Sequence, residues 1–257
     1  MAGEPLFPTL SQPGSLRVLF QPVVALGGGL ATRFVEALTR GPRGTNLENA
    51  DVLFEYARRK GMAAELDRLC VRLAITAAAA LPPHLGLSLN VHASTLEQDR
   101  SFAPHLLELS AANGRAPSNL IVEIVEHAPR WSEAGFHEAL AALRRAGVRI
   151  ALDDIGCGQS SYRMMLDCNP EYFKIDRYLV QGSHADTRRQ AVLDSIRSLA
   201  RTFAAQVVAE GVETAADLAT VRDLDLDLAQ GYLLAAPQTA AELCAGLVSG
   251  AVRAREE

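Results

Sequence analysis

The chain alternates between short apolar runs and longer stretches in which apolar residues recur every three or four positions. From Leu16 the pattern indicates two strands, over 16–26 and 32–40, with Gly27, Gly28 and Gly29 between them. Two such runs joined by a short glycine-containing turn are typical of a hairpin. The sequence therefore predicts an antiparallel pair of strands at the start of the fold.

After this hairpin, apolar runs typical of strands alternate with amphipathic stretches typical of helices. We expect strands at 85–91, 119–126, 148–154, 172–176, 205–212 and, more weakly, 228–234. The clearest predicted helices are at 63–81, 133–147, 187–204, 214–224 and 240–252, with a further helix near 54–61. Two hairpin strands and six later strands make eight. This order favours an α/β fold with a single TIM-like (β/α)8 barrel and an irregular antiparallel N-terminal β-hairpin.

The domain boundaries follow from the same pattern. Residues 1–15 contain Glu4, Pro5 and Pro8 where a signal peptide would be basic and then apolar, so we expect a flexible leader. No Pro/Gly/Ser-rich linker interrupts 16–253, which we expect to be one domain.

The longest apolar run, 73–81, is about half as long as a membrane span. The four cysteines show no CxxC or zinc-site spacing, which favours a reduced, cytoplasmic protein.

Composition and charge indicate which kinds of ligand the protein could bind. Of 257 residues, 49 % are hydrophobic and 21 % charged, as in an ordinary globular protein. The chain carries 25 basic and 30 acidic side chains, for a formal net charge of −5. This balance argues against binding DNA or RNA through a general basic field. A small anionic ligand stays compatible with it if metal cations assist.

Polar residues stand where the predicted strands end. In a (β/α)8 barrel these ends surround one mouth, where the active site lies. The sequence therefore predicts a bowl that is rich in carboxylates and also holds one amide and one lysine. The residues concerned are Glu36, Asn90, Glu123, Asp153, Asp154, Lys174, Asp176, Glu210, Glu213 and Gln230.

Such a bowl needs compensating positive charge. Two carboxylates about 4 Å apart repel by roughly 4 kcal/mol at an effective dielectric near 20, so protons or cations must be present. Oxygen ligands without His or Cys suit Mg²⁺ or Mn²⁺. Hydrolysis of a phosphodiester on two metal ions fits this pattern. An enolase-like proton abstraction with Lys174 as base fits it too.

Eight ordered segments identify a family. They are QPVV (21–24), EALTR (36–40), LSLNVHAS (87–94), IVEIVE (121–126), IALDD (150–154), YFKID (172–176), VVAEGVET (207–214) and QGYLLAAP (230–237). Over about residues 16–250 the chain strongly resembles the EAL domain of cyclic di-GMP phosphodiesterases. The resemblance implies hydrolysis of cyclic di-GMP to linear pGpG in the bacterial cytoplasm, with two Mg²⁺ or Mn²⁺ ions activating the attacking water.

The resemblance also implies a role for each matching residue. Metal ligands would be Glu36, Asn90, Glu123 and Asp153 for one ion, and Asp153, Asp154 and Glu210 for the other. Catalytic roles would fall to Lys174, Glu210 and Glu213, of which Lys174 would position the water or stabilise the phosphate. Otherwise Lys174 would form a salt bridge with Asp176. Substrate-binding roles would fall to Gln21, Leu38, Arg40 and Gln230, with Gln230 and Glu213 also orienting the metal ligands.

One departure from the family concerns a loop after the paired aspartates. Strand side chains alternate, so Glu126 should lie just beyond the strand that carries Glu123. The resemblance implies that Glu126 anchors the loop DDIGCGQSSY (153–162), which is linked to homodimer formation and to activity. The family pattern there is nearer DDFGTGYSS. This difference leaves a second reading open, a catalytically silent receptor that binds cyclic di-GMP and signals through a regulatory or sensor protein partner.

Overall fold

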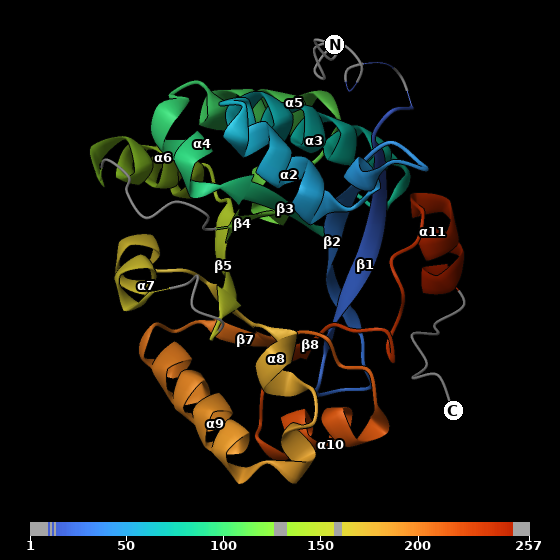
Figure 1. Ribbon diagram of the computed structural model, residues 1–257, viewed down its shortest axis with the longest axis vertical. Coiled ribbons are helices and arrows are strands. Elements are labelled where there is room, and N and C mark those ends of the chain that lie inside the picture. The colour runs from blue at the N-terminus through green and yellow to red at the C-terminus, as the bar shows by residue number, and fades with distance from the viewer. Residues whose placement is uncertain (1–9, 11, 13, 126–132, 157–160, 249–257) are drawn as a thin grey trace.

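Eight β-strands close into one barrel in the order in which they follow along the chain (Figure 1). The structure is a computed structural model that describes residues 10, 12, 14–125, 133–156 and 161–248. The strands are β1 (Arg17–Ala25), β2 (Thr32–Arg40), β3 (Gly86–His92), β4 (Leu120–Val125), β5 (Arg149–Ile155), β6 (Tyr172–Ile175), β7 (Gln206–Ala209) and β8 (Leu228–Ala229). The predicted barrel is confirmed.

The N-terminal hairpin makes the barrel irregular. Strand β1 pairs antiparallel with both β2 and β8, whereas the pairs from β2 round to β8 are all parallel. The predicted hairpin is therefore also confirmed. Strands β7 and β8 are shorter than the apolar runs predict, because residues 210–214 and 230–237 leave the sheet as loops and turns.

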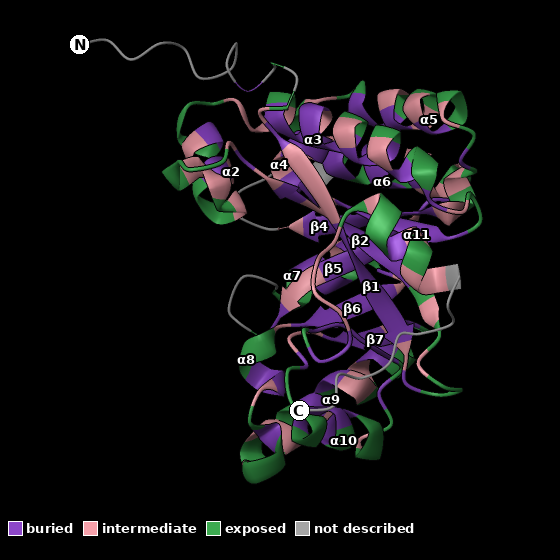
Figure 2. Ribbon diagram, turned by 90° about the vertical axis from the view of Figure 1, so that its right-hand side faces the viewer, coloured by how far each residue is buried: buried purple, intermediate pink, exposed green. Residues whose placement is uncertain are grey.

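Helices cover the outside of the barrel (Figures 1 and 2). They are α2 (Ala50–Arg59), α3 (Ala63–Ala77), α4 (Ala93–Gln98), α5 (Phe102–Ala112), α6 (Glu133–Arg145), α7 (Tyr162–Cys168), α8 (Arg177–Val180), α9 (Thr187–Thr202), α10 (Ala215–Asp223) and α11 (Ala240–Val248). Among these, α4, α5, α7 and α8 are absent from the list of clearest predicted helices. Three of them span fewer than eight residues, which is too short for a clear helical period.

Alternation along the strands separates two apolar regions. In β2, Val35 and Ala37 point outward and pack in the large cluster beneath the helices, whereas Phe34 lies inside the barrel. The interior cluster fills one layer of the barrel and consists of Val23, Phe34, Ile121, Ala151, Tyr172, Val208 and Leu228, with Ala25 packed against it.

This apolar layer supports the candidate site. In the parallel strands, the side chain two residues further on points into the barrel one layer closer to the mouth. Two residues beyond Phe34, Ile121, Ala151, Tyr172, Val208 and Leu228 stand Glu36, Glu123, Asp153, Lys174, Glu210 and Gln230. In the reversed strand β1 the equivalent step is backward, from Val23 to Gln21. The polar layer therefore lies directly on the apolar layer.

Two further observations bear on the predicted boundaries. Leu10 is buried, and it packs with Leu16 against Leu53 of α2 and Leu66 of α3. The start of the domain at residue 16 stays a prediction. In the described part of the chain, no helix combines the length and the apolar character that crossing a membrane would require.

Candidate active site

The ammonium group of Lys174 lies at the centre of a cluster of carboxylates inside the barrel. Its Nζ is 2.5 Å from Glu123 Oε2, 2.7 Å from Glu210 Oε1, 3.2 Å from Asp153 Oδ1 and 3.3 Å from Glu36 Oε2. Lys174 is 1 % exposed and Glu123 is fully buried. The carboxylates around Lys174 thus come from four different strands or strand ends, β2, β4, β5 and β7.

Most of these residues lie deeper than the predicted strand ends. Glu36 is the central residue of β2 rather than its last, and Asn90, Glu123 and Lys174 are also internal to their strands. The prediction that each of them ends its strand is wrong, because a layer of the barrel cuts the tilted strands at different heights. The prediction that they share one mouth-side layer is confirmed.

The charges in this cluster shift one another's pKa. Burial disfavours the charged form of each group, so it lowers the pKa of Lys174 and raises the pKa of Glu123 and Glu210. For Lys174, burial lowers the pKa, but the surrounding carboxylates outweigh burial and hold it well above the ordinary value. For Glu123, burial and the charge of Glu36 outweigh Lys174 and raise the pKa to about 8. For Glu210, burial likewise raises the pKa well above the ordinary value despite Lys174.

Glu36 is held in its charged form by neighbours. Burial raises its pKa, but the charge of Lys174 and hydrogen bonds from Asn90 and Gln230 lower it by more, so the net shift is downward. Asn90 Nδ2 donates to Glu36 Oε1 at 2.9 Å, and Gln230 Nε2 donates to Glu36 Oε2 at 2.8 Å. Gln230 Nε2 also lies 3.0 Å from Gln21 Oε1, and Gln21 Nε2 donates to the carbonyl of Ala235. Gln21 and Gln230 therefore fix the orientation of Glu36.

Asp153 and Asp154 both reach the site, although consecutive residues of a regular strand point to opposite faces. The register of β5 against β6 breaks between Leu152 and Ile155, and Asp154 has a left-handed backbone with φ of 54°. This irregularity brings one oxygen each of Asp153, Asp154 and Glu210 within 4.8 Å of one another. Burial, followed by the charge of Asp153, raises the pKa of Asp154 to about 6.

The donor set fits a divalent cation. Every group in the cluster except Lys174 offers oxygen ligands, which Mg²⁺ and Mn²⁺ prefer. Among the described residues, no hydrogen-bond donor satisfies Glu123 Oε1, although the atom is buried. A buried carboxylate oxygen without a donor is costly, and a bound cation would satisfy it.

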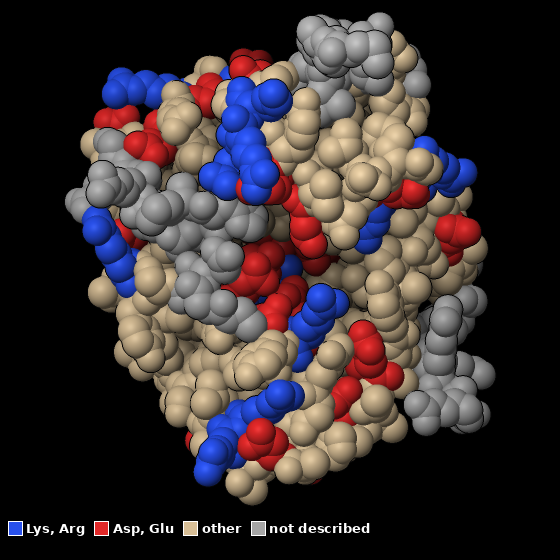
Figure 3. Space-filling view, in the orientation of Figure 1, with Lys and Arg blue, Asp and Glu red and all other residues tan. Residues whose placement is uncertain are grey.

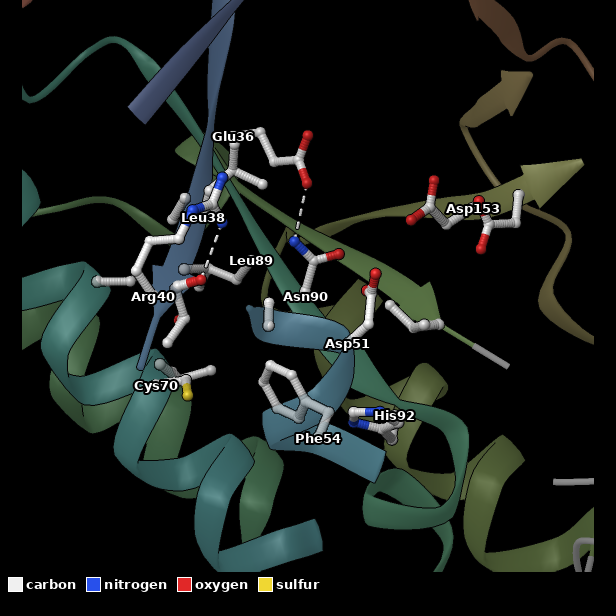
Figure 4. A pocket seen from close by; sticks show the side chains of 17 residues that line it. Glu36, Leu38, Arg40, Asp51, Phe54, Cys70, Leu89, Asn90, His92 and Asp153 are labelled. Carbon is white, nitrogen blue, oxygen red and sulfur yellow. Dashed lines mark hydrogen bonds between the residues drawn. The ribbon is translucent and has the colours of Figure 1, made fainter. Parts of the chain in front are cut away.

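Other predicted site residues lie further out. Leu38 and Arg40 line a cavity beside the carboxylates, and Arg40 Nη1 donates to the carbonyl of Thr39 at 2.9 Å (Figure 4). Glu213 is exposed in the loop after β7, and no hydrogen bond or ion pair joins its side chain to another described residue. Glu126 lies outside the described residues. The carboxylate of Asp176 accepts a hydrogen bond from Tyr178 N and caps α8, while the Lys174 ammonium faces the four other carboxylates.

The cavity also has residues that sequence reasoning missed. Asp51 and Phe54 of α2 and His92 of β3 line it together with Asn90 and Asp154. In Figure 3, acidic side chains fill the hollow at the centre of this face, and basic side chains lie around it. Asp51 and Phe54 are three residues apart, so they lie on the same side of a helix. This spacing is a sequence signal that could have indicated that both residues face the cavity.

The chain is similar in sequence to known cyclic di-GMP phosphodiesterases. A probable cyclic di-GMP phosphodiesterase, PdeG of Escherichia coli K12, is 30 % identical over 236 residues, which are 90 % of this chain and 46 % of PdeG. The chain thus spans about half the length of that curated relative.

Two solved structures have the same barrel. A standalone EAL protein from Vibrio cholerae O395 bound to c-di-GMP aligns with a TM-score of 0.78 and 26 % identity, over 90 % of this chain and 95 % of that one. The manganese and cyclic di-GMP complex of Klebsiella pneumoniae BlrP1 gives a TM-score of 0.78 and 26 % identity, over 89 % of this chain and 58 % of that one. Residues 7–237 match the EAL domain as a family. With its barrel, its carboxylate layer and its ordered motifs in agreement, the chain belongs to the EAL domain family.

Proposed function

We propose that this chain is a metal-dependent phosphodiesterase that hydrolyses cyclic di-GMP to linear pGpG. One observation carries the proposal: six oxygen-bearing side chains from five strands or strand ends gather at the mouth side of the barrel, close to the buried Lys174. These are Glu36, Asn90, Glu123, Asp153, Asp154 and Glu210. The names of the relatives and the ligands in the related structures support the same substrate.

We assign the metal ligands in two groups that share Asp153. Glu36, Asn90, Glu123 and Asp153 would hold one ion, and Asp153, Asp154 and Glu210 would hold the second. Two Mg²⁺ or Mn²⁺ ions bound here would supply positive charge for the phosphate and lower the pKa of a water molecule. The three-carboxylate cluster of Asp153, Asp154 and Glu210 is the better defined of the two groups.

The remaining residues of the site would orient the Glu36 carboxylate and neutralise the negative charge of the substrate phosphate. In the protein without metal, the surrounding carboxylates raise the pKa of Lys174, so Nζ keeps its proton. Lys174 would donate a hydrogen bond to a phosphate oxygen or to the attacking water. Gln230 and Asn90 hold the two oxygens of Glu36 in place. Arg40 at the edge of the cavity would contact a substrate phosphate. Hydrolysis adds water across one phosphodiester bond, so one ribose regains its hydroxyl and the phosphate stays on the other.

The test is product analysis of cyclic di-GMP incubated with the purified chain and Mn²⁺. We expect linear pGpG, and we expect Glu36→Ala and Asp153→Asn to abolish its formation. Asp223→Asn, an exposed change on α10, is the matched control and should retain activity. A folded, metal-loaded protein that yields no linear product would refute the proposed activity.

The receptor function is the second candidate. It is favoured by the loop sequence DDIGCGQSS, which departs from the family pattern at Ile155, Cys157 and Gln159. Residues 157–160 lie outside the described residues. Calorimetry that shows tight binding of cyclic di-GMP under conditions without turnover would favour the receptor, which would then signal through a protein partner.

We also propose a homodimer in the cytoplasm. Large exposed apolar side chains on two helices support the dimer: Tyr162 and Leu166 on α7 are 77 % and 71 % exposed, and Tyr178 on α8 is 61 % exposed. Sedimentation velocity with Leu166→Glu tests this, since the substitution should shift the population toward monomer.

A further inference from the structure

A second cavity lies where the end of α2 meets the starts of α3 and α4. Its volume is about 240 Å³, and among its lining residues it shares only His92 with the cavity beside the carboxylates. His92 therefore lies between the two cavities. Pockets that enclose a whole drug-sized ligand usually measure ~300–1,000 Å³. The second cavity is thus suited to one compact chemical group.

The lining of the second cavity offers hydrogen-bond donors and no carboxylate. Arg58 comes from α2, and Ser94 and Gln98 come from α4. No aspartate or glutamate is among the residues that line it. The side chains of Ser94 and Gln98 make no hydrogen bond with another described residue. A guanidinium, a hydroxyl and an amide that lie together in this way suit an oxyanion.

Arg58 has donors that its ion pair leaves unused. Its Nε donates to Glu55 Oε2 at 2.8 Å, and its Nη2 donates to Glu55 Oε1 at 2.9 Å. A guanidinium has five N–H donors, and these two bonds leave three of them for a ligand. The Arg58 side chain is 46 % exposed, so a ligand can reach it from solvent.

The end of α2 also carries an excess of positive charge. Glu55 is shared with Arg59, whose Nε lies 2.6 Å from Glu55 Oε1, and Lys60 follows directly. Three cations thus stand beside one carboxylate. In Figure 3, basic side chains gather over α2 on this face of the molecule. An anion bound in the second cavity would compensate this excess.

The buried carboxylate of Asp67 does not oppose such an anion directly. It does not line the second cavity, and its oxygens accept from His92 N at 3.0 Å and from Thr95 Oγ1 at 2.6 Å and contact His92 Nδ1 at 3.0 Å. Ala63 and Ala64, in the first turn of α3, complete the lining. The start of this helix has no side-chain cap, so its backbone N–H groups add to the attraction that Arg58 provides.

We propose that the second cavity binds an oxyanion of the phosphate type, either the phosphate ion or the phosphoryl group of a small monoester. Arg58 donates to its oxygens, and Ser94 and Gln98 complete the contacts. This site goes beyond the proposed function, because it needs neither a metal ion nor a cyclic dinucleotide. Through His92, its occupant would lie next to the active-site cavity without touching the carboxylates around Lys174.

The experiment is calorimetry with inorganic phosphate. The protein is freed of metal with EDTA and then dialysed, and NaCl holds the ionic strength constant so that general screening stays the same. We expect saturable binding, with a Kd about tenfold weaker or more in Arg58→Gln, as for loss of a hydrogen bond to a charged group. Arg58→Lys keeps the charge without the planar fork and should lie between the two. Ser94→Ala should weaken binding by a smaller factor.

Arg59→Gln is the matched control. Arg59 pairs with the same carboxylate as Arg58, but it does not line the second cavity, so this variant should bind phosphate within about twofold of the unmodified chain. Circular dichroism verifies that each variant is folded. A titration with glycerol 3-phosphate then identifies the source of the group. Tighter binding than that of phosphate assigns the site to a phosphorylated small molecule, and weaker binding assigns it to the free ion.

Three results would overturn the site. One is the lack of saturable binding of either compound by the unmodified chain. Another is an equal loss in Arg58→Gln and Arg59→Gln, which would indicate attraction by diffuse surface charge. The third is a loss in Arg40→Gln with none in Arg58→Gln, which would place the anion in the active-site cavity. Because these titrations contain no metal and no cyclic dinucleotide, such results would leave the proposed activity untouched.

Discussion

Lys174 Nζ lies 2.5 Å from Glu123 Oε2, and neither side chain is more than 1 % exposed. The chain has only two lysines, this one and Lys60. A buried charge is tolerated only where partners compensate for its lost hydration. In the protein without bound metal, Lys174 is therefore the positive charge that allows several carboxylates to share the barrel interior.

Lys174→Met should destabilise the metal-free protein by about 3–5 kcal/mol, the usual cost of breaking a buried ion pair. Mn²⁺ should restore more stability to this variant than to the unmodified chain, because a cation would replace the missing charge. Chemical denaturation in EDTA and in Mn²⁺ measures both effects. Lys60→Met is the control, since Lys60 is exposed and, among the described residues, its ammonium makes only a cation–π contact with Tyr56, worth about 1 kcal/mol or less. Equal stability of Lys174→Met and the unmodified chain in EDTA would contradict this account.

The raised pKa of Glu123 makes stability depend on pH. Between its ordinary value of 4.5 and about 8, the folded protein keeps a proton on Glu123 that the unfolded chain releases. The folded state then binds more protons, so the free energy of unfolding falls as pH rises, by up to about 1.4 kcal/mol per pH unit. Glu123→Gln removes the part of this pH dependence that Glu123 contributes.

The stability of Glu123→Gln relative to the unmodified chain, measured in EDTA, should increase from pH 5 to pH 8. For the exposed Glu138→Gln the same difference should stay flat, and a flat profile for Glu123→Gln would sink the prediction.

Asp67 connects α3 to the end of β3. It is fully buried and accepts hydrogen bonds from His92 N at 3.0 Å and from Thr95 Oγ1 at 2.6 Å. Asp67→Asn replaces one acceptor oxygen with a donor, and we expect it to cost about 1–3 kcal/mol. Because Asn90 lies two residues before His92, Mn²⁺ affinity should weaken as well. Urea denaturation and calorimetry measure the two effects, and Glu65→Gln on the exposed side of α3 should change neither. Unaltered urea midpoints for Asp67→Asn would show that these bonds contribute little.

Two glycines should respond to alanine in opposite directions. A Cβ on Gly231 would lie 2.1 Å from Val212 O and 2.3 Å from Val212 N, both backbone atoms. Gly231→Ala should therefore destabilise the fold by about 1–3 kcal/mol or more, and should reduce turnover by displacing Gln230. A Cβ on Gly246 meets no atom of the described residues within 4 Å, and Gly246 lies in α11, so Gly246→Ala should stabilise the fold by about 0.5–1 kcal/mol. Thermal denaturation compares them, and a shift of the same sign in both would contradict the argument.

The fold could be predicted from the sequence because its determinants are periodic. In β2, Phe34 and Glu36 face the interior while Val35 and Ala37 pack outward, so alternation within the sequence already separates the two faces. The same alternation applies to four of the six proposed metal ligands. Glu36, Glu123, Asp153 and Glu210 each stand two residues beyond a member of the apolar layer.

Other parts of the site depend on relationships that no local pattern carries. The convergence of Asp153 and Asp154 needs a left-handed residue in a strand, against the preference of side chains other than glycine. The position of Asp51 depends on how α2 packs, which is set by contacts with distant segments. The depth of Glu36 follows from the tilt of the closed barrel, a property of eight strands together.

Strand β1 runs against the other strands, and its first residue, Arg17, pairs with Arg40 at the carboxyl end of β2. The polypeptide therefore enters the barrel at the rim that carries the proposed active site, whereas a regular barrel begins its first strand on the opposite face. Just before this point, Leu10 and Leu16 lie in the same apolar cluster against which Phe54 packs. Leu10 and Leu16 thus support, from the outside, the helix α2 that borders the cavity beside the carboxylates.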